Sequence, residues 1–100
     1  MIARIWHGVT PAAKADEYVE YLNKTGLPDY AATEGNRGVY LLRKLDGDQA
    51  HFITLTFWDS EQAIEKFAGH DSEKAKYYPE DAQFLLEFES RVQHYQVMNK

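Results

Sequence analysis

The sequence predicts an α+β domain with the ferredoxin-like βαββαβ order, in which a four-stranded antiparallel sheet carries its helices on one face. Three observations predict this fold. Several segments are rich in β-branched and aromatic residues, others repeat apolar residues at helical spacing, and the middle strands flank Asp46-Gly47-Asp48, a strong hairpin signal. A hairpin placed between two crossover helices is the split βαβ arrangement. Because 100 residues leave room for one core, we expect residues 1–100 to form a single domain.

The first half of the chain is predicted to hold one strand and one main helix. Residues 2–9 (IARIWHGV) are mostly apolar, β-branched or aromatic and form the strand. Thr10-Pro11 then begins the helix, because threonine caps helices and proline suits the first helical position. Gly26 is expected to end this helix, and the glycine-rich segment 34–38 predicts a turn. The buried stripe of the helix has helical spacing: Ala15, Tyr18, Val19 and Leu22.

The second half begins with a hairpin of strands 39–45 and 52–58. Asp59 and Ser60 compete to cap a second helix, whose buried stripe is Ala63, Ile64 and Phe67. A further short helix is expected over residues 71–77, after which Pro79 breaks the chain. Residues 85–97 are predicted to form a long final strand.

Apolar residues on both faces of the predicted sheet indicate a homodimer. On the third strand, one face carries Ile53, Leu55 and Phe57, and the other carries Phe52, Thr54, Thr56 and Trp58. Two helices cover one face only, so the other face would leave Phe52, Trp58, Leu42 and Trp6 in water. We expect that face to pack against the sheet of a second copy, with the final strand reaching across to it. The alternative is scattered surface aromatics, which need no partner.

Composition excludes several classes of protein. The formal net charge is −5 with scattered acidic residues, which argues against nucleic acid as a partner. The apolar runs are too short to span a membrane. A chain without cysteine has no disulfide, thiol nucleophile or thiolate metal site. The histidines lack metal-ligand spacing, and no phosphate or dinucleotide motif occurs. We therefore expect no metal site, no cofactor site and a cytoplasmic location.

The stretch from His51 to Phe67 resembles the antibiotic biosynthesis monooxygenase family of dimeric α/β barrels. Its most recognisable part is the pattern Trp-x-Ser-x-x-Ala-x-x-x-Phe, here Trp58 to Phe67, and the turn at 34–38 is similar too. The resemblance implies a pocket between sheet and helices. It also implies either cofactor-independent oxygenation of aromatic polyketide quinols or haem degradation. The haem-degrading branch uses Asn, Trp and His where this sequence has His7, Phe67 and Tyr77, so none of the three matches.

Oxygenation without a cofactor needs a base that removes a proton from a phenol or enol in a site that excludes water. His7 is the candidate base, expected to face the helices, with Tyr77 or Tyr78 orienting the substrate. The alternative for His7 is a strand-end histidine bonded to a loop carbonyl, and for both tyrosines it is cover for the core edge. Further candidates for contact with a small-molecule substrate are Trp58, Phe67 and Tyr18, each of which also suits ordinary core packing.

Three functions therefore stay open at the level of sequence. The first is a cofactor-free monooxygenase that acts on a small aromatic or polyketide-like compound. The second is a dimeric module without catalytic activity, which binds a small ligand or serves in a stress response. The third is a haem-binding or haem-degrading protein. Domains of this fold serve many functions, so the fold does not choose among the three.

Overall fold

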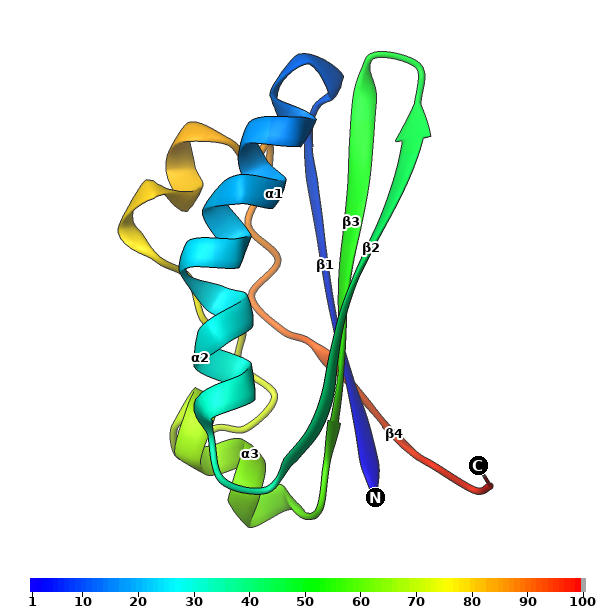
Figure 1. Cartoon of the computed structure of the whole chain (residues 1–100), viewed down its shortest axis with the longest axis vertical. Helices are drawn as coiled ribbons and strands as arrows, with labels where there is room; N and C mark the ends of the chain where they lie inside the picture. The colour runs from blue at the N-terminus through cyan, green and yellow to red at the C-terminus, as the bar shows by residue number, and fades with distance from the viewer. Residues whose placement is uncertain (100) are drawn as a thin grey trace.

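The computed structural model describes residues 1–99 and confirms the α+β ferredoxin-like fold. One antiparallel sheet has the strand order β2-β3-β1-β4, and the helices cover one of its faces (Figure 1). The strands are β1 (Ile2–Pro11), β2 (Asn36–Asp46), β3 (Gln49–Trp58) and β4 (Gln93–Gln96). The α-helices are α1 (Ala15–Lys24), α2 (Gly26–Ala32) and α3 (Glu61–Ala68), and the 3-10 helices are η1 (Ala12–Lys14) and η2 (Pro79–Gln83). The expectation of a single domain over residues 1–100 stays a prediction.

The register of the strands decides which side chains share a face. β1 pairs with β3 along its whole length, from Ile2 opposite Trp58 to Pro11 opposite Gln49. β2 and β3 form the predicted hairpin, whose turn contains Gly47 at a φ of 61°, a conformation that glycine adopts at little cost. β4 pairs only with the first half of β1, up to Ile5 opposite Gln93. Beyond that point, the coil that precedes β4 runs along the edge of β1.

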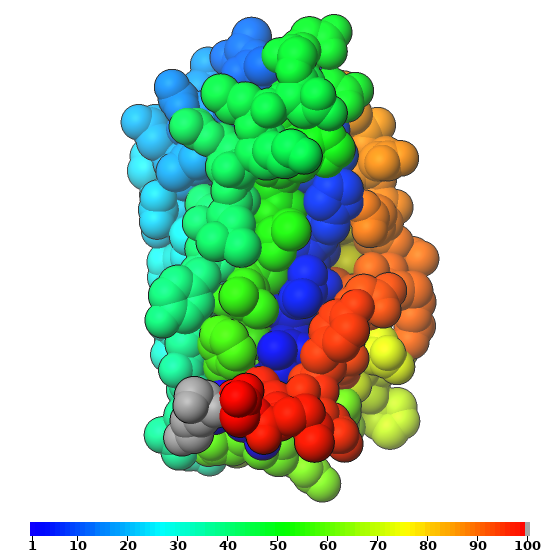
Figure 2. Space-filling view, turned by 90° about the vertical axis from the view of Figure 1, so that its right-hand side faces the viewer, coloured from blue at the N-terminus to red at the C-terminus, as the bar shows by residue number. Residues whose placement is uncertain are grey.

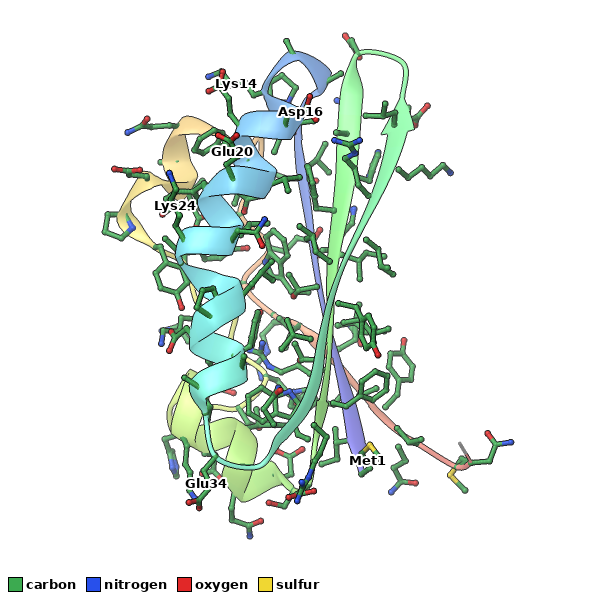
Figure 3. The ribbon with its side chains drawn as sticks, viewed as in Figure 1. Met1, Lys14, Asp16, Glu20, Lys24 and Glu34 are labelled. Carbon is green, nitrogen blue, oxygen red and sulfur yellow. The ribbon has the colours of Figure 1, made fainter. Side chains whose placement is uncertain are left out.

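The core lies between the sheet and the helices. Phe52 of β3 is fully buried there in one cluster with Trp6 of β1, and Trp58 of β3 is fully buried in a second cluster with Ile64 of α3. Helix α1 buries Tyr18 and Leu22 against this layer, whereas Lys24 lies on its outer side (Figure 3). The prediction of which side chains lie on the uncovered face of the sheet is therefore mostly wrong. Phe52, Trp58 and Trp6 are under the helices, and of the four only Leu42 is exposed.

The uncovered face of the sheet, which we call the open face (Figure 2), nevertheless carries a group of apolar side chains. Strand alternation places Ile53, Leu55 and Phe57 of β3 on this face. Their neighbours Tyr40 and Leu42 on β2 are about half exposed, with 57% and 47% of their surface in water. A homodimer therefore stays a prediction, now supported by these residues of the open face rather than by Phe52, Trp58 and Trp6.

Two predicted elements of the C-terminal third are wrong. The long strand expected at 85–97 is limited to Gln93–Gln96, because the residues before it bond elsewhere. Val92 N–H donates to the Glu73 carbonyl at 2.8 Å and Ala75 N–H to the Ser90 carbonyl at 3.0 Å, so the coil pairs with the loop after α3. For the same reason, residues 71–77 form no helix. Pro79 does not break a helix but begins η2.

Smaller differences occur at the first helices. β1 continues through Pro11, and η1 follows it without a side-chain cap from Thr10. Gly26 does not end the first helix but begins α2, and Thr25 separates α1 from α2. Of the two predicted caps for the helix after β3, Ser60 and not Asp59 caps α3, because the Ser60 Oγ accepts the Ala63 N–H at 3.2 Å.

Candidate functional site

The residues predicted for the site lie on opposite sides of the sheet. His7 belongs to the open face, because its neighbours Trp6 and Gly8 have the parity that faces the helices. The expectation that His7 faces the helices is therefore wrong. Tyr18, Tyr77 and Tyr78 lie on the helix side. The structure thus separates the candidate base from the residues that were expected to orient a substrate.

On the open face, four ionisable side chains form a chain across the sheet. His7 Nδ1 is 2.5 Å from Glu89 Oε2, and His7 Nε2 is 3.0 Å from His51 Nδ1. His51 Nε2 lies 3.8 Å from Asp46 Oδ2. The imidazole rings are nearly parallel, at 21°, with their centres 5.3 Å apart. This arrangement orients His7 from one side by a carboxylate and from the other by a second imidazole.

Strand pairing brings the two histidines together. His7 is opposite Ile53, and His51 is two residues along β3 from Ile53, so the histidines are diagonal neighbours on one face. Glu89 comes from the coil that follows the edge of β1 where β4 does not pair. Glu89 could not be predicted as a site residue, because residues 85–97 were expected to form a strand. His51 was detectable, since it shares the parity of Ile53.

A hollow of about 380 Å³ lies beside His7, His51 and Asp46, and one side of it is open to solvent. Leu42 and Ile53 provide an apolar floor, and Lys44 provides an ammonium group. Arg43 also lines the hollow, but its guanidinium extends to α1, where it pairs with Asp16 at 2.7 Å. The hollow is large enough for one aromatic ring with substituents, although small ligand sites usually enclose more of their ligand.

The space between sheet and helices is filled by side chains. Only about 20 Å³ is left among the aromatic residues, which is room for about one water molecule. Trp6 Nε1 donates to the Tyr77 hydroxyl at 3.2 Å, and Tyr77 donates to the Glu89 carbonyl at 2.6 Å. Tyr77 and His7 therefore contact the same residue from opposite sides of the sheet: Tyr77 its main chain, His7 its carboxylate.

The tyrosines of this space are held as hydrogen-bond donors. Tyr18 donates to Asp81 Oδ1 at 3.0 Å, and Tyr78 donates to Asp29. Burial and the neighbouring carboxylate raise the pKa of both phenols, and burial raises the pKa of Tyr77. Burial also raises the pKa of Asp81, although the Tyr78 N–H and the Tyr18 hydroxyl oppose this rise. At neutral pH these phenols are protonated and cannot serve as bases.

Trp58 and Phe67, the other candidates for substrate contact, are core residues. Trp58 is completely buried, and its Nε1 donates to Thr56 Oγ1 at 2.8 Å. Phe67 stacks on Tyr30 with ring centres 4.3 Å apart, and the Arg4 and Lys76 cations lie over its ring. Neither lines the hollow on the open face or the small inner space.

Within residues 1–99, no group of three or more His, Asp or Glu side chains is arranged to hold a metal ion. No helix in the same range is both long and apolar enough to cross a membrane. The expected cytoplasmic location stays a prediction.

The fold and these residues place the chain in a known class of small α+β proteins. It belongs to the antibiotic biosynthesis monooxygenase family, whose model matches residues 2–75. This family includes monooxygenases and haem-degrading proteins. The resemblance found in the Trp58 to Phe67 stretch is thereby confirmed. No curated protein matches the chain.

Solved structures of similar proteins agree on the fold. A putative antibiotic biosynthesis monooxygenase from Bacillus cereus has a TM-score of 0.65 at 15% identity, over 99% of this chain and 94% of that one. The Mycobacterium tuberculosis protein Rv0793 has a TM-score of 0.61 at 20% identity, over 99% and 96%. The haem degrader MhuD from M. tuberculosis, with two haems bound in its active site, has a TM-score of 0.58 at 18% identity, over 100% and 98%. At these identities the likeness concerns the fold alone.

Proposed function

We propose that this protein is a homodimeric, cofactor-independent monooxygenase of a small aromatic substrate, with the His7–His51 pair as its base. The observation that carries the proposal is the position of His7 between Glu89 and His51, at 2.5 and 3.0 Å, beside a hollow with an apolar floor. A base oriented by a carboxylate is the arrangement that general base catalysis uses. The family supports the reaction class, because it includes monooxygenases.

The reaction begins when the histidine pair removes a proton from a phenol or enol. The resulting anion transfers an electron to dioxygen, and the two radicals combine at a ring carbon. One oxygen atom then becomes a carbonyl of the substrate, and the other leaves as water with two hydrogen atoms that the substrate loses. The protein has to take up one proton, hold the anion and exclude bulk water. Glu89 is a positioning residue here, because it contacts His7 and does not line the hollow.

Water is excluded from the hollow only if the hollow is covered, and one copy of the protein does not cover it. His7 and His51 have 34% and 32% of their side-chain surface in water. The apolar open face continues from the hollow through Leu42 and Tyr40, and apolar area of this kind is typical of a protein interface. Members of the family are typically homodimers. We infer that a second copy packs against the open face and closes the hollow.

The test is an oxygen electrode with a panel of hydroquinones and related phenols. We expect oxygen consumption by the wild type and a loss of about 100-fold or more in His7→Ala, which is the usual contribution of a general base. His70→Ala is the matched control, because the His70 side chain is fully exposed at the end of α3, away from the site. Equal activity of His7→Ala and wild type would remove His7 from the mechanism.

A dimeric ligand-binding module without catalytic activity is the second candidate, and the filled inner space favours it. Family-type substrates were expected between sheet and helices, where about 20 Å³ is left. If no compound of the panel causes oxygen uptake while ligands bind the open face, this second function holds.

Haem does not fit the space between sheet and helices. Only about 20 Å³ is free there, and the Trp6–Tyr77 hydrogen bond joins two of the residues that line it. The haem-binding alternative therefore predicts a Soret shift on titration with haem, whereas the filled space predicts none.

A further inference from the structure

We propose that the hollow on the open face binds a neutral phenol, that His51 Nε2 takes the phenolic proton, and that Lys44 holds the phenolate. This inference rests on the proposed function and deepens it, because it names the class of substrate and two further residues of the same site.

The hydrogen-bond chain determines which ring nitrogen is available to a ligand. The Glu89 carboxylate only accepts hydrogen bonds, so the adjacent Nδ1 of His7 carries a proton. The other nitrogen of a neutral imidazole is an acceptor, so His7 Nε2 accepts the Nδ1–H of His51. His51 Nε2 then has a free lone pair. Asp46 Oδ2 is 3.8 Å from it, which is beyond hydrogen-bond distance.

A phenol at His51 Nε2 can therefore lose its proton along this chain. The phenolic O–H bond breaks, and the proton forms a bond to His51 Nε2. The proton on His51 Nδ1 moves to His7 Nε2, and the electron pair of the broken bond stays on the phenolate oxygen. The new positive charge is then on His7 beside the Glu89 carboxylate, where the pairing stabilises it. No oxidant takes part in this step.

Lys44 is the cation that is left for the phenolate. It lies opposite His51 in the β2–β3 register and lines the same hollow, so the two side chains project from the same face about 5 Å apart at Cβ. Arg43, the other cation of the lining, is paired with Asp16. An ammonium group beside a phenolate favours the ionised form by lowering the pKa of the phenol by about one unit or more.

The charges at the hollow select a neutral ligand. Glu89 and Asp46 contribute two carboxylates and Lys44 contributes one ammonium group, while the guanidinium of Arg43 is already paired with Asp16. A phenol adds no charge before its proton moves, and afterwards the phenolate lies between Lys44 and a protonated histidine pair. An aromatic carboxylate would add a third negative charge and occupy Lys44. The site should therefore prefer phenols to aromatic acids of the same size.

The test uses para-nitrophenol, whose anion is yellow, at a pH below its own pKa. Binding to the wild type should raise the ratio of phenolate to phenol about tenfold, as a shift of one pKa unit implies. Lys44→Met and His51→Gln should each lose most of this rise. Lys24→Met is the matched control, because Lys24 is on the outer side of α1, and it should behave as the wild type. An excess of para-nitrobenzoate should not displace the probe.

No colour change on addition of protein, or an equal change in Lys44→Met and the wild type, would overturn the inference. Displacement by para-nitrobenzoate would overturn the preference for neutral ligands. The oxygen electrode separates this outcome from the proposed function. Oxygen uptake that depends on His7 without a Lys44-dependent colour change refutes the inference alone. A Lys44-dependent colour change without oxygen uptake refutes the monooxygenase and leaves a phenol-binding site.

Discussion

Tyr18→Phe removes a single hydroxyl from a buried pair and leaves the core volume almost unchanged. Tyr18 and Asp81 expose 1% and 3% of their surface, and the tyrosine donates to the carboxylate at 3.0 Å. The carboxylate would keep only the Tyr78 N–H, which donates at 2.6 Å. A hydrogen bond to a charged group contributes about 1.5–3 kcal/mol, so we expect a loss of about 2 kcal/mol in unfolding free energy. For a domain of this size, the melting temperature should fall by about 10 °C.

The effect should also depend on pH, with a sign that follows from the pKa of Asp81. Burial raises this pKa in the folded protein, and the Tyr18 hydroxyl opposes the rise. The folded state binds the proton more tightly than the unfolded chain, so it gains relative stability as pH falls through the folded pKa. Without the hydroxyl the pKa of Asp81 rises further, and the variant gains more. The difference between variant and wild type should therefore shrink on acidification.

Urea unfolding followed by circular dichroism, at neutral pH and about two units lower, measures both quantities. Tyr21→Phe is the control, because the Tyr21 hydroxyl accepts the Glu80 N–H at 3.2 Å in an exposed position, and its loss should cost less than about 0.5 kcal/mol. A loss of unfolding free energy in Tyr18→Phe no larger than that in Tyr21→Phe would contradict the first expectation. A loss in Tyr18→Phe that grows on acidification would contradict the second.

Leu42→Glu places a carboxylate on the open face and should weaken the dimer at least about 100-fold, because burial of an unpaired charge costs several kcal/mol. Sedimentation of variant and wild type at equal concentration checks this. A dimer of unchanged stability would reject the interface. The Ser72 hydroxyl, opposed by burial, and His94 lower the pKa of Glu61. The stabilisation that Glu61 contributes is present above its pKa in the unfolded chain and is lost as pH falls through its pKa in the folded protein. Glu61→Gln should therefore make the unfolding free energy depend less on acidic pH, and it should lower that free energy by less than about 1 kcal/mol at neutral pH. Gly35→Ala should cost about 1–3 kcal/mol in thermal unfolding, because φ is 92° and the new Cβ would be 2.5 Å from Ala63 Cβ; an effect no larger than that of Gly47→Ala, where no atom lies within 4 Å, contradicts this.

The local patterns of the sequence were sufficient for the fold. The strand at 2–9, the hairpin around Gly47 and the helix with the Ala63, Ile64 and Phe67 stripe all occur in the structure. These elements are set by side-chain periodicity and turn chemistry, which act between residues close in sequence. Local sequence was also sufficient to predict the family, because the Trp58 to Phe67 stretch covers the end of β3, the cap of α3 and the buried residues of α3.

Periodicity states which residues share a face, but it does not state which face the helices cover. That is why Trp6 and Trp58 were placed on the wrong side and His7 on the helix side. The coverage depends on how α1 to α3 cross the sheet, which is a tertiary property. The filling of the inner space is also tertiary, because it depends on the summed volumes of side chains from distant segments.

The sequence by itself determined the first three strands, the helix after β3, the βαββαβ order and the family, whereas the C-terminal elements were wrongly predicted. Only the tertiary structure decided the site. His7 and Glu89 are 82 residues apart, and His7 and His51 are 44 apart. They meet because residues 90–92 bond to the loop after α3 and so release the preceding coil to follow the edge of β1. No local pattern encodes that choice, since it is a competition for hydrogen-bond partners between segments far apart in the chain.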